Sequence, residues 1–371
     1  MVSCLHDHGV VEVEVPINIA LIKYWGKRDE ELMLPVNSSM SLNINALVAH
    51  TMVRCSCEIT DSVTINGLKV DLDRSRRFRR CFDFARDLIG KRKNEGHVKQ
   101  DEQNLGFEIS SSTNFPVAAG LASSAAGFAA IAIGIGRLFD FSITEVSTLA
   151  RLGSGSACRS VFGGLVEWCA GIDPSGCDCI TKQVFPESWW PELRAVILIL
   201  DDAEKEVGSS IGMRRTMETS ELLKHRAENV VPGRIKRLTT AFKTRNFDEF
   251  ARITMADSDQ LHAVCLDSFP PLRYMSDASW SVVRSINEFN SAGIRAAYSF
   301  DAGPNACIFV EEANITDLLN HISRHLQLPE NVRPLLKGCG DGSVEVPHPN
   351  TSFVIREVII SEVGGAPKIL S

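Results

Sequence analysis

The stretch Pro116-Val-Ala-Ala-Gly-Leu-Ala-Ser-Ser-Ala-Ala-Gly127 decides how this chain of 371 residues is interpreted. A strand-like run at 107–112 leads into it, and an alanine-rich helical segment continues from it through Leu138. The first N–H groups of a helix have no partner within the helix, and the helix dipole leaves partial positive charge there. Small side chains let a phosphate approach these groups, and the hydroxyls of Ser123 and Ser124 add donors. The stretch therefore predicts a phosphate cradle for a nucleotide.

The same residues have a simpler interpretation, in which Gly120 and Ser123 only cap a core helix, since serine is common at helix N-caps. The stretch is not the nucleotide-binding P-loop, because no Gly-Lys-Ser/Thr follows at the required spacing, and it is not the dinucleotide fingerprint. Taken alone, it leaves both interpretations open, so the other motifs of the chain have to decide.

Four further stretches accompany it. In chain order they are Pro16-Ile-Asn-Ile-Ala-Leu-Ile-Lys-Tyr-Trp-Gly-Lys-Arg-Asp29, Leu34-Pro-Val-Asn-Ser-Ser-Met-Ser-Leu42, Gly153-Ser-Gly-Ser-Ala-Cys-Arg-Ser-Val-Phe-Gly-Gly164 and Ser299-Phe-Asp-Ala-Gly-Pro-Asn-Ala-Cys307. Together these stretches resemble the mevalonate diphosphate decarboxylase family, a branch of the GHMP kinase superfamily. The resemblance covers roughly residues 12–310. The segments 23–27 and 154–159 separate the decarboxylases from their kinase relatives.

The resemblance implies an α+β, two-lobed GHMP-kinase fold. Its N-terminal lobe is ribosomal-protein-S5-like, its C-terminal lobe is ferredoxin-like, and the active site lies in the cleft between the lobes. A loop rich in Gly, Pro, Cys and Asp at 171–191 separates a strand-rich first half from a helix-rich second half. We therefore expect an N-terminal nucleotide- and substrate-binding domain at 1–190 and a C-terminal domain at 191–371.

Hydrophobic periodicity predicts the individual elements. The strands expected in the first half include 10–15, 41–44, 46–59, 107–112 and 163–170. The helices expected there are 74–89 and 142–152, besides the one that follows the phosphate cradle. The second half is expected to carry strands at 193–200, 296–300, 305–310, 343–346 and 353–359, and helices at 209–223, 229–244, 246–265, 279–291 and 315–326.

In the family, ATP phosphorylates the tertiary 3-hydroxyl of (R)-5-diphosphomevalonate. Phosphate then leaves as carbon dioxide is lost, which gives isopentenyl diphosphate and ADP in the mevalonate pathway of isoprenoid and sterol biosynthesis. A hindered alcohol needs a positioned carboxylate to accept its proton, and Asp301 matches the family's catalytic aspartate. Outside this motif, an aspartate before Ala-Gly would be interpreted as a turn residue.

Two cations complete the expected catalytic group. Lys23 matches a family lysine that holds the transferred phosphoryl group; the alternative is a surface lysine, although Ile22 and Trp25 beside it are apolar. Arg159 matches an arginine that binds the C1 carboxylate, a task that suits a planar guanidinium better than an ammonium group.

The resemblance also implies substrate contacts. Ser154 and Ser156 match contacts to the diphosphate and the carboxylate, and Ser209 with Ser210 matches a further diphosphate contact, for which a simple N-cap is the competing account. Arg76 is the alignment choice for a diphosphate contact within the basic cluster 74–80, whose other arginines fit a solvated helix face. The expected substrate-binding set is Ala20, Tyr24, Trp25, Gly26, Lys27, Arg76, Ser154, Gly155, Ser156, Ala157, Cys158, Arg159, Ser209 and Ser210.

ATP and Mg²⁺ are the implied cofactors. Ser123 matches a family serine near the β- and γ-phosphates, and adenine is expected against the segment 104–112. No obvious second carboxylate stands out as a ligand for Mg²⁺, so ATP and water are expected to hold most of the ion. The expected nucleotide-binding set is Gly120, Leu121, Ala122, Ser123, Ser124, Ser110 and Ser112.

Composition limits the partners and the location. The net charge of −7 argues against general nucleic-acid binding, which usually needs a basic excess. The longest apolar run, at 195–200 with its flanks, has the length of a buried strand and not of a membrane span. The N-terminus has no basic segment followed by an apolar one. We expect a cytoplasmic protein that binds small molecules and forms a homodimer, as family members usually do.

Cysteines and histidines give little sign of a metal site. The 11 cysteines are an odd number in a chain with no secretory signal, which favours free thiols over a disulfide framework. His321 and His325 are four residues apart on an expected helix and could share a metal, but no third ligand with convincing spacing appears.

Two other functions are weighed against the decarboxylase. A kinase that stops after phosphorylation is disfavoured by Arg159 and by the Tyr24-Trp25 wall. A non-catalytic member of the superfamily that binds partners should have lost the lysine or the aspartate, and both Lys23 and Asp301 are present.

Overall fold

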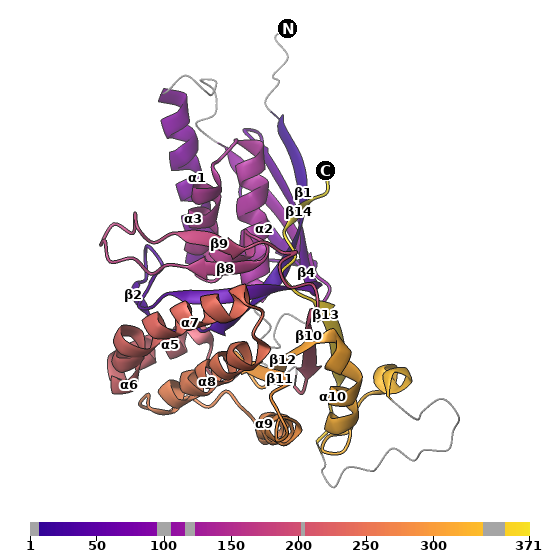
Figure 1. The fold of residues 1–371 in the computed structure, drawn as a ribbon. Coiled ribbons are helices and arrows are strands. Elements are labelled where there is room, and N and C mark those ends of the chain that lie inside the picture. The colour runs from indigo at the N-terminus through magenta and orange to yellow at the C-terminus, as the bar shows by residue number, and fades with distance from the viewer. Residues whose placement is uncertain (1–6, 95–104, 116–122, 202–204, 337–352) are drawn as a thin grey trace.

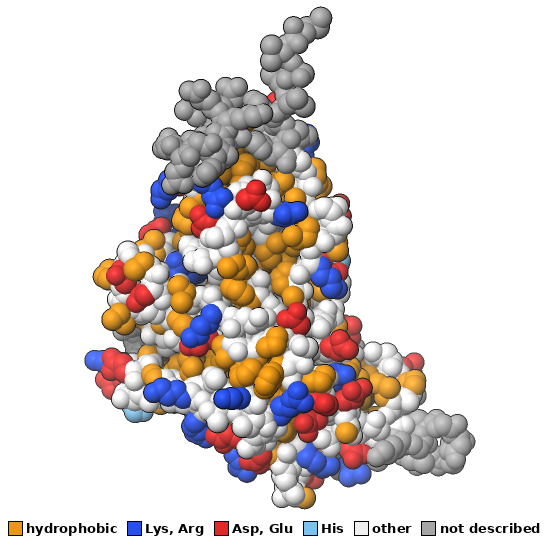
Figure 2. All heavy atoms as spheres, turned by 45° about the horizontal axis from the view of Figure 1, so that its top comes forward, with side chains coloured by type: hydrophobic (Ala, Val, Ile, Leu, Met, Phe, Trp, Pro, Cys, Tyr) orange, Lys and Arg blue, Asp and Glu red, His pale blue; other side chains and the backbone are white. Residues whose placement is uncertain are grey.

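The structure, a computed structural model, has two large, mainly antiparallel sheets with helices packed on them, as the α+β prediction requires (Figure 1). On the face shown in Figure 2, basic and acidic side chains are interspersed around apolar ones. Among the described residues, no helix combines the length and the apolar character needed to cross a membrane. The described residues are 7–94, 105–115, 123–201, 205–336 and 353–371.

Two long strands carry the first sheet. β1 (Asp7–Ile22) and β4 (Ser39–Ser56) pair antiparallel along most of their length. Val11, Val13 and Val15 are buried on one side of β1, and the acidic residues between them face the other side, as the alternation of a half-buried strand requires. The strand order is β14-β1-β4-β7-β5-β6, with β8 paired to β4 and β9 paired to β8. The other strands here are β5 (Ser62–Ile65), β6 (Leu68–Lys69), β7 (Gly106–Thr113), β8 (Leu165–Trp168) and β9 (Thr181–Phe185), while β2 (Lys27–Asp29) and β3 (Leu34–Pro35) form a separate pair.

Helices α1, α2 and α3 pack with this sheet (Figure 1). α2 lies against β1 and β4, and a Cβ atom at Gly134 would come within 2.5 Å of a Val53 methyl group, so this close approach depends on glycine. α3 begins with a capping box between Ser142 and Glu145. The bounds are α1 (Arg76–Asn94), α2 (Ser123–Leu138), α3 (Ile143–Gly153) and α4 (Ala157–Ser160).

The second sheet has four strands in the order β11-β12-β10-β13. Alternate residues of β10 face two different cores: Val196 and Leu198 pack with α9 and α10, whereas Ala195 and Ile197 belong to the core that α7 and α8 share with the first sheet. The strands are β10 (Leu193–Ile199), β11 (Ala296–Phe300), β12 (Ala306–Glu311) and β13 (Glu357–Glu362). The helices are α5 (Ser209–Thr219), α6 (Glu221–His225), the π-helical turn η1 (Arg226–Val230), α7 (Val231–Lys243), α8 (Phe247–Leu266), α9 (Asp277–Phe289) and α10 (Ile315–Ile322), with 3₁₀ turns η2 (Glu312–Asn314) and η3 (Glu330–Leu335).

The end of the chain returns to the first sheet. β14 (Lys368–Ile369) pairs with β1 at Val13 and Glu14, and the C-terminus lies beside β1 in Figure 1. The last residues therefore pack with the sheet that the first half of the chain builds.

Several element boundaries differ from those expected. The predicted strands 41–44 and 46–59 are one strand, interrupted by a bulge where the partner of Pro16 is Val48 and the partner of Ile17 is Ile44. The predicted helix 209–223 divides at Ser220, whose side chain caps α6. The predicted strand 343–346 lies outside the described residues.

Candidate active site

A cavity of about 1000 Å³ brings together residues from both halves of the chain. Its walls come from β1, the start of α1, the segment 154–159, the start of α5 and the turn after β11. The expected site residues that line it are Ala20, Lys23, Tyr24, Trp25, Lys27, Arg76, Ser124, Ser154, Gly155, Ser156, Arg159, Ser209, Ser210 and Asp301.

Other expected residues do not line this cavity. Ala157 and Cys158 are fully buried within α4, and Gly26 lies behind the wall. Ser110 and Ser112 are exposed on β7, away from the cavity lining. α2 begins at Ser123, whereas Gly120, Leu121 and Ala122 fall outside the described residues.

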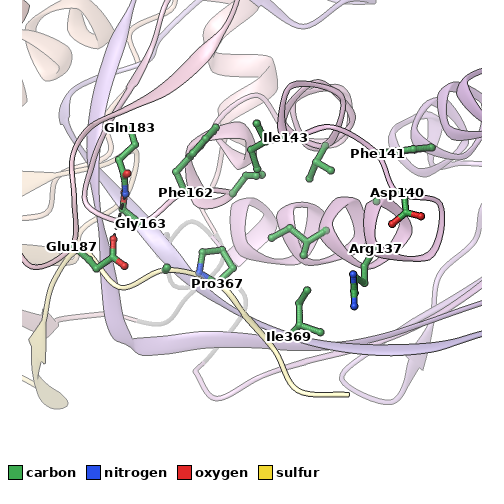
Figure 3. A pocket seen from close by; sticks show the side chains of 15 residues that line it. Arg137, Asp140, Phe141, Ile143, Phe162, Gly163, Gln183, Glu187, Pro367 and Ile369 are labelled. Carbon is green, nitrogen blue, oxygen red and sulfur yellow. Dashed lines mark hydrogen bonds between the residues drawn. The ribbon is translucent and has the colours of Figure 1, made fainter.

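A second cavity, of about 590 Å³, opens elsewhere (Figure 3). It lies between the end of α2, the start of α3 and the segment before β14, with Arg137, Phe141 and Pro367 among its walls. Gln183 donates a hydrogen bond across its edge to the carbonyl of Gly163 (2.9 Å). None of the expected site residues that the structure describes lines it, so the larger of these two cavities is the candidate active site.

Lys23 and Asp301 form a close ion pair at the edge of this cavity. The Lys23 Nζ atom lies 2.6 Å from Asp301 Oδ1 and donates a second hydrogen bond to Ser299 Oγ (2.7 Å). The lysine side chain is 2% exposed and the aspartate side chain 28% exposed. The cation is therefore fixed, while the carboxylate keeps open surface towards the cavity.

A buried ionic network holds the backbone of Lys23. The N–H of Lys23 donates to Asp257 Oδ1 (2.8 Å), and its carbonyl accepts from Arg226 (3.2 Å). Arg226 and Asp257 are wholly buried and 2.6 Å apart, and Arg234 adds a second pair to Asp257. Burial alone would raise the pKa of Asp257, but the two guanidinium groups and the N–H of Lys23 hold it below its ordinary value.

Asp257→Asn is expected to lower the free energy of unfolding by about 3–5 kcal/mol, because it leaves the buried guanidinium of Arg226 without its ionic partner. Urea denaturation measures this loss. The control is Asp248→Asn on the same helix, where the ion pair with Arg252 is exposed and is worth at most about 1 kcal/mol. Because the folded-state pKa of Asp257 is lowered, its contribution is present above the unfolded pKa and shrinks as the pH falls below about 4. Equal losses in the two variants would contradict this account.

Arg159 is buried without an ionic partner among the described residues. Its guanidinium donates to Ser39 Oγ (2.7 Å), Ser41 Oγ (2.9 Å) and Asn18 Oδ1 (3.0 Å). Its carbon atom Cζ lies 5.9 Å from the Trp168 ring centroid. Burial lowers the pKa of Arg159, and the charge of Asp301 opposes this shift. A desolvated cation held only by neutral groups is a site for an anionic ligand.

Tyr24 and Trp25 form the wall next to Lys23. The Tyr24 ring packs on Trp168 with centroids 4.8 Å apart, and its buried hydroxyl has no hydrogen-bond partner within the described part of the chain. Trp25 donates to Thr216 Oγ1 (3.0 Å) and packs edge-on against Tyr274. Trp25 therefore ties this wall to α5 of the other half of the chain.

Small polar residues bring backbone close to the cavity. Ser154 Oγ lies 3.2 Å from Ser124 Oγ, which joins the segment before α4 to the first turn of α2. A Cβ atom at Gly155 would come within 2.9 Å of the Tyr24 hydroxyl oxygen, so this close approach depends on glycine. Ser156 precedes α4 without a side-chain cap, so its hydroxyl is not used by that helix.

Cations surround the mouth of the cavity. Arg74, Arg76, Arg77 and Arg80 line it from the start of α1, and burial lowers the pKa of Lys27. Of these arginines, Arg77 donates to the carbonyl of Gly153 (2.6 Å), and Arg80 donates to the carbonyl of Glu30 (2.9 Å).

The segment just before α5 adds a further cation to the cavity lining. Lys205 donates to the carbonyl of Ala302 (2.6 Å) and to Ser209 Oγ (3.2 Å). The N-cap of α5 is Gly208, so the N-cap interpretation of Ser209 and Ser210 is wrong. Both hydroxyls lie within the cavity lining, where the helix does not use them as caps.

Several residues that support the site were not predicted from the sequence. Asn18, Ser39 and Ser41 lie within quoted motifs, and the two-residue spacing of the serines puts both on one face of β4, which was a usable signal. Lys205, Asp257 and Arg226 lie in segments with no motif, so nothing in their spacing pointed to the cavity.

The fold and the cavity define a two-lobed enzyme whose site, rich in cations and hydroxyls, suits a phosphorylated, carboxylate-bearing small molecule. Family models described as "Mevalonate 5-diphosphate decarboxylase C-terminal domain" and "Diphosphomevalonate decarboxylase-like N-terminal domain" match residues 195–370 and 15–181. The chain belongs to the diphosphomevalonate decarboxylase family of the GHMP kinase superfamily. This confirms the family, the two-lobed fold and the decarboxylase class expected from the sequence.

Individual relatives agree over nearly the whole chain. The diphosphomevalonate decarboxylase of Homo sapiens is 40% identical over 98% of this chain and 94% of its own length. The solved mevalonate diphosphate decarboxylase from Trypanosoma brucei is 36% identical, with a TM-score of 0.87 and 98% of both chains covered. A solved complex of MDDEF with MVAPP, AMPPCP and magnesium is 28% identical, with a TM-score of 0.78, and the match covers 98% of this chain and 99% of that one.

Proposed function

We propose that the large cavity is the active site for the activity of this family. In that reaction, (R)-5-diphosphomevalonate and ATP give isopentenyl diphosphate, carbon dioxide, ADP and phosphate. The observation that carries the assignment is the meeting of three groups in one cavity: the Lys23–Asp301 pair and the buried Arg159 guanidinium. A carboxylate, an ammonium and a guanidinium without an ionic partner match the hydroxyl, the transferred phosphoryl group and the carboxylate of this substrate.

Asp301 is proposed as the proton acceptor. One of its oxygens is held by Lys23 at 2.6 Å, which fixes the carboxylate, and its exposed part faces the cavity. The 3-hydroxyl would donate to the carboxylate as it attacks the γ-phosphorus of ATP, and its proton would pass to Asp301. Lys23 then lies beside the new phosphate ester, where its charge stabilises the phosphate that departs.

Arg159 is proposed to hold the substrate carboxylate. Ser39, Ser41 and Asn18 fix the plane of the guanidinium before any ligand arrives. A carboxylate held in that plane keeps its bond to C2 in a constant direction relative to the departing phosphate on C3. Loss of carbon dioxide leaves the electron pair of that bond to form the alkene as phosphate leaves.

The remaining donors suit the diphosphate and the nucleotide. The four arginines at the start of α1, Lys27, Lys205 and the serines at 154, 156, 209 and 210 surround the mouth, and α2 begins beside Ser124. ATP is proposed to place its phosphates near Ser123 and Ser124, with Gly120, Leu121 and Ala122 contributing as the resemblance implies. Arg76 stays the proposed diphosphate contact, and Ser110 and Ser112 stay predictions.

The cavity also fits Mg²⁺, since Glu206 and Asp301 line it and carboxylates are ligands that this ion prefers. Bound Mg²⁺ would neutralise charge on phosphate oxygens. The solved MDDEF complex with MVAPP, AMPPCP and magnesium supports binding of a nucleotide and this ion in the family.

A division into domains at 1–190 and 191–371 is also proposed. The proposed boundary lies between β9, which ends at Phe185 in the first sheet, and β10, which begins at Leu193 in the second sheet. β14 would then be a C-terminal strand that joins the sheet of the other domain. The homodimer and the cytoplasmic location stay predictions.

The test is incubation of the chain with ATP, Mg²⁺ and (R)-5-diphosphomevalonate, with ADP, phosphate and carbon dioxide measured together. The proposal expects the three products in equal amounts. ADP without carbon dioxide would leave only a kinase. A chain that produces neither would contradict catalysis and favour a binding role.

Arg159→Lys is expected to lower kcat/KM about 10- to 100-fold. Lysine keeps the positive charge but lacks the planar guanidinium that can donate two parallel hydrogen bonds to a carboxylate. Steady-state kinetics with varied diphosphomevalonate measure the loss. Arg151→Lys is the matched control: Arg151 is a buried arginine of α3 that donates to the carbonyl of Cys179 and does not line the cavity. An unchanged kcat/KM for Arg159→Lys would remove the carboxylate assignment.

A further inference from the structure

A cluster of possible metal ligands lies outside the cavity, between α9 and the end of α10. It contains Glu288, His321 and His325, whose ligand atoms all lie within 4.8 Å of one another. His325 Nε2 is 3.3 Å from Glu288 Oε2, and the two imidazole rings have centroids 4.9 Å apart. Glu288 supplies the third ligand that the histidine spacing alone did not reveal. We infer that these three side chains bind one divalent transition-metal ion, with Zn²⁺ the best match to two imidazoles and a carboxylate.

The hydrogen bonding of His321 points to a ligand. Its Nε2 atom is shielded from solvent and has no hydrogen-bond partner among the described residues, an arrangement that is unfavourable for a buried polar atom. A metal ion at Nε2 would give that atom the partner it lacks.

The surrounding structure positions the three groups. Phe289 on α9 and Leu318 and Ile322 on α10 belong to one hydrophobic core, which fixes the two helices against each other. α10 ends at Ile322, and the turn after it carries His325 back over His321. The ligands therefore come from two elements that the core already holds together, and their ligand atoms lie within 4.8 Å of one another.

The simplest other account is a surface ion pair between His325 and Glu288. That account explains their contact, but it leaves the shielded Nε2 atom of His321 unused. The two accounts differ in what His321 does: it is a ligand in the metal site and a bystander in the ion pair. An ion at this place would join α9 to α10 and stabilise the C-terminal half without entering the cavity.

Zinc binding to the full chain, measured by isothermal titration calorimetry, tests the inference. All samples carry Cys177→Ser, because Cys177 is an exposed free thiol that would compete for zinc. Cys4, His6 and His8 are further side chains that bind zinc. The quantity compared is therefore the number of zinc equivalents that each variant loses relative to the protein that keeps Glu288, His321 and His325. The variants are His321→Ala, His325→Ala and Glu288→Gln. His50→Ala is the control, since His50 also lies near a glutamate (3.5 Å from Glu14) but has no third ligand among the described residues.

His321→Ala and His325→Ala are each expected to bind one equivalent of zinc less. Glu288→Gln is expected to lower the zinc affinity of this site at least about tenfold, since even groups that only orient a metal ligand contribute that much to affinity. Zinc should raise Tm in the control but not in the two histidine variants. The Co²⁺-loaded control should show the visible absorption of a tetrahedral site, and His321→Ala should lack it. Equal zinc equivalents and affinities in the control and His321→Ala would overturn the inference, and Tm without metal verifies that each variant folds.

Discussion

Replacing Asp301 by asparagine is expected to lower kcat about 10²- to 10⁴-fold, the range for loss of a general base. Asparagine keeps the shape of the side chain and can still accept a hydrogen bond from Lys23, but it cannot take the proton of the 3-hydroxyl. KM for diphosphomevalonate should change much less, because Arg159 and the cations at the mouth remain. Carbon dioxide release under substrate saturation measures kcat directly.

Asp259→Asn is the matched control for this variant. Asp259 accepts a hydrogen bond from the hydroxyl of Tyr298 (3.0 Å), on the strand that leads to Asp301, but it does not line the cavity. Its kcat should stay within a few-fold of the parent. Near-parental kcat in Asp301→Asn would mean that Asp301 has only a structural role.

Lys23→Met is expected to lower kcat about 10²- to 10³-fold, comparable to loss of a donor that stabilises charge in the transition state. Methionine matches the length of the lysine stem and suits the buried site, but it removes the ammonium group beside Asp301 and Ser299. Single-turnover release of phosphate measures the effect. Lys243→Met, at an exposed position near the end of α7, is the control.

The double variant adds a second criterion. Because Lys23 and Asp301 are in contact, the effects of the two substitutions on kcat should not multiply. The double variant Lys23→Met/Asp301→Asn should therefore lose clearly less kcat than the product of the two single losses. Fully multiplicative losses would show that the two groups act independently and would contradict a paired site.

Local sequence predicted the elements that have strong periodicity. β10 is a continuous apolar run because both of its faces are buried, and the sequence signals this directly. The interruption predicted between residues 44 and 46 is a bulge within one strand, because the local pattern breaks there although pairing with β1 continues. β14 has two residues and pairs with a strand more than 350 positions earlier, so no local signal marks it.

The site could be predicted only where motifs carried it. Lys23, Arg159 and Asp301 were expected to meet, and all three line one cavity. Asp257 and Arg226 support Lys23 through contacts between residues more than 200 positions apart, which depend on the tertiary fold. Gly26, Ala157 and Cys158 belong to matching motifs but lie behind the cavity wall, which indicates that a motif includes residues that shape a site as well as residues that contact ligand.

The most direct test is a crystal structure of the chain with (R)-5-diphosphomevalonate and a non-hydrolysable ATP analogue. The account predicts the 3-hydroxyl within about 2.6–3.2 Å of an Asp301 carboxylate oxygen, and the C1 carboxylate at a similar distance from the Arg159 guanidinium. A substrate bound in this cavity with its hydroxyl away from Asp301, or with its carboxylate away from Arg159, would contradict it.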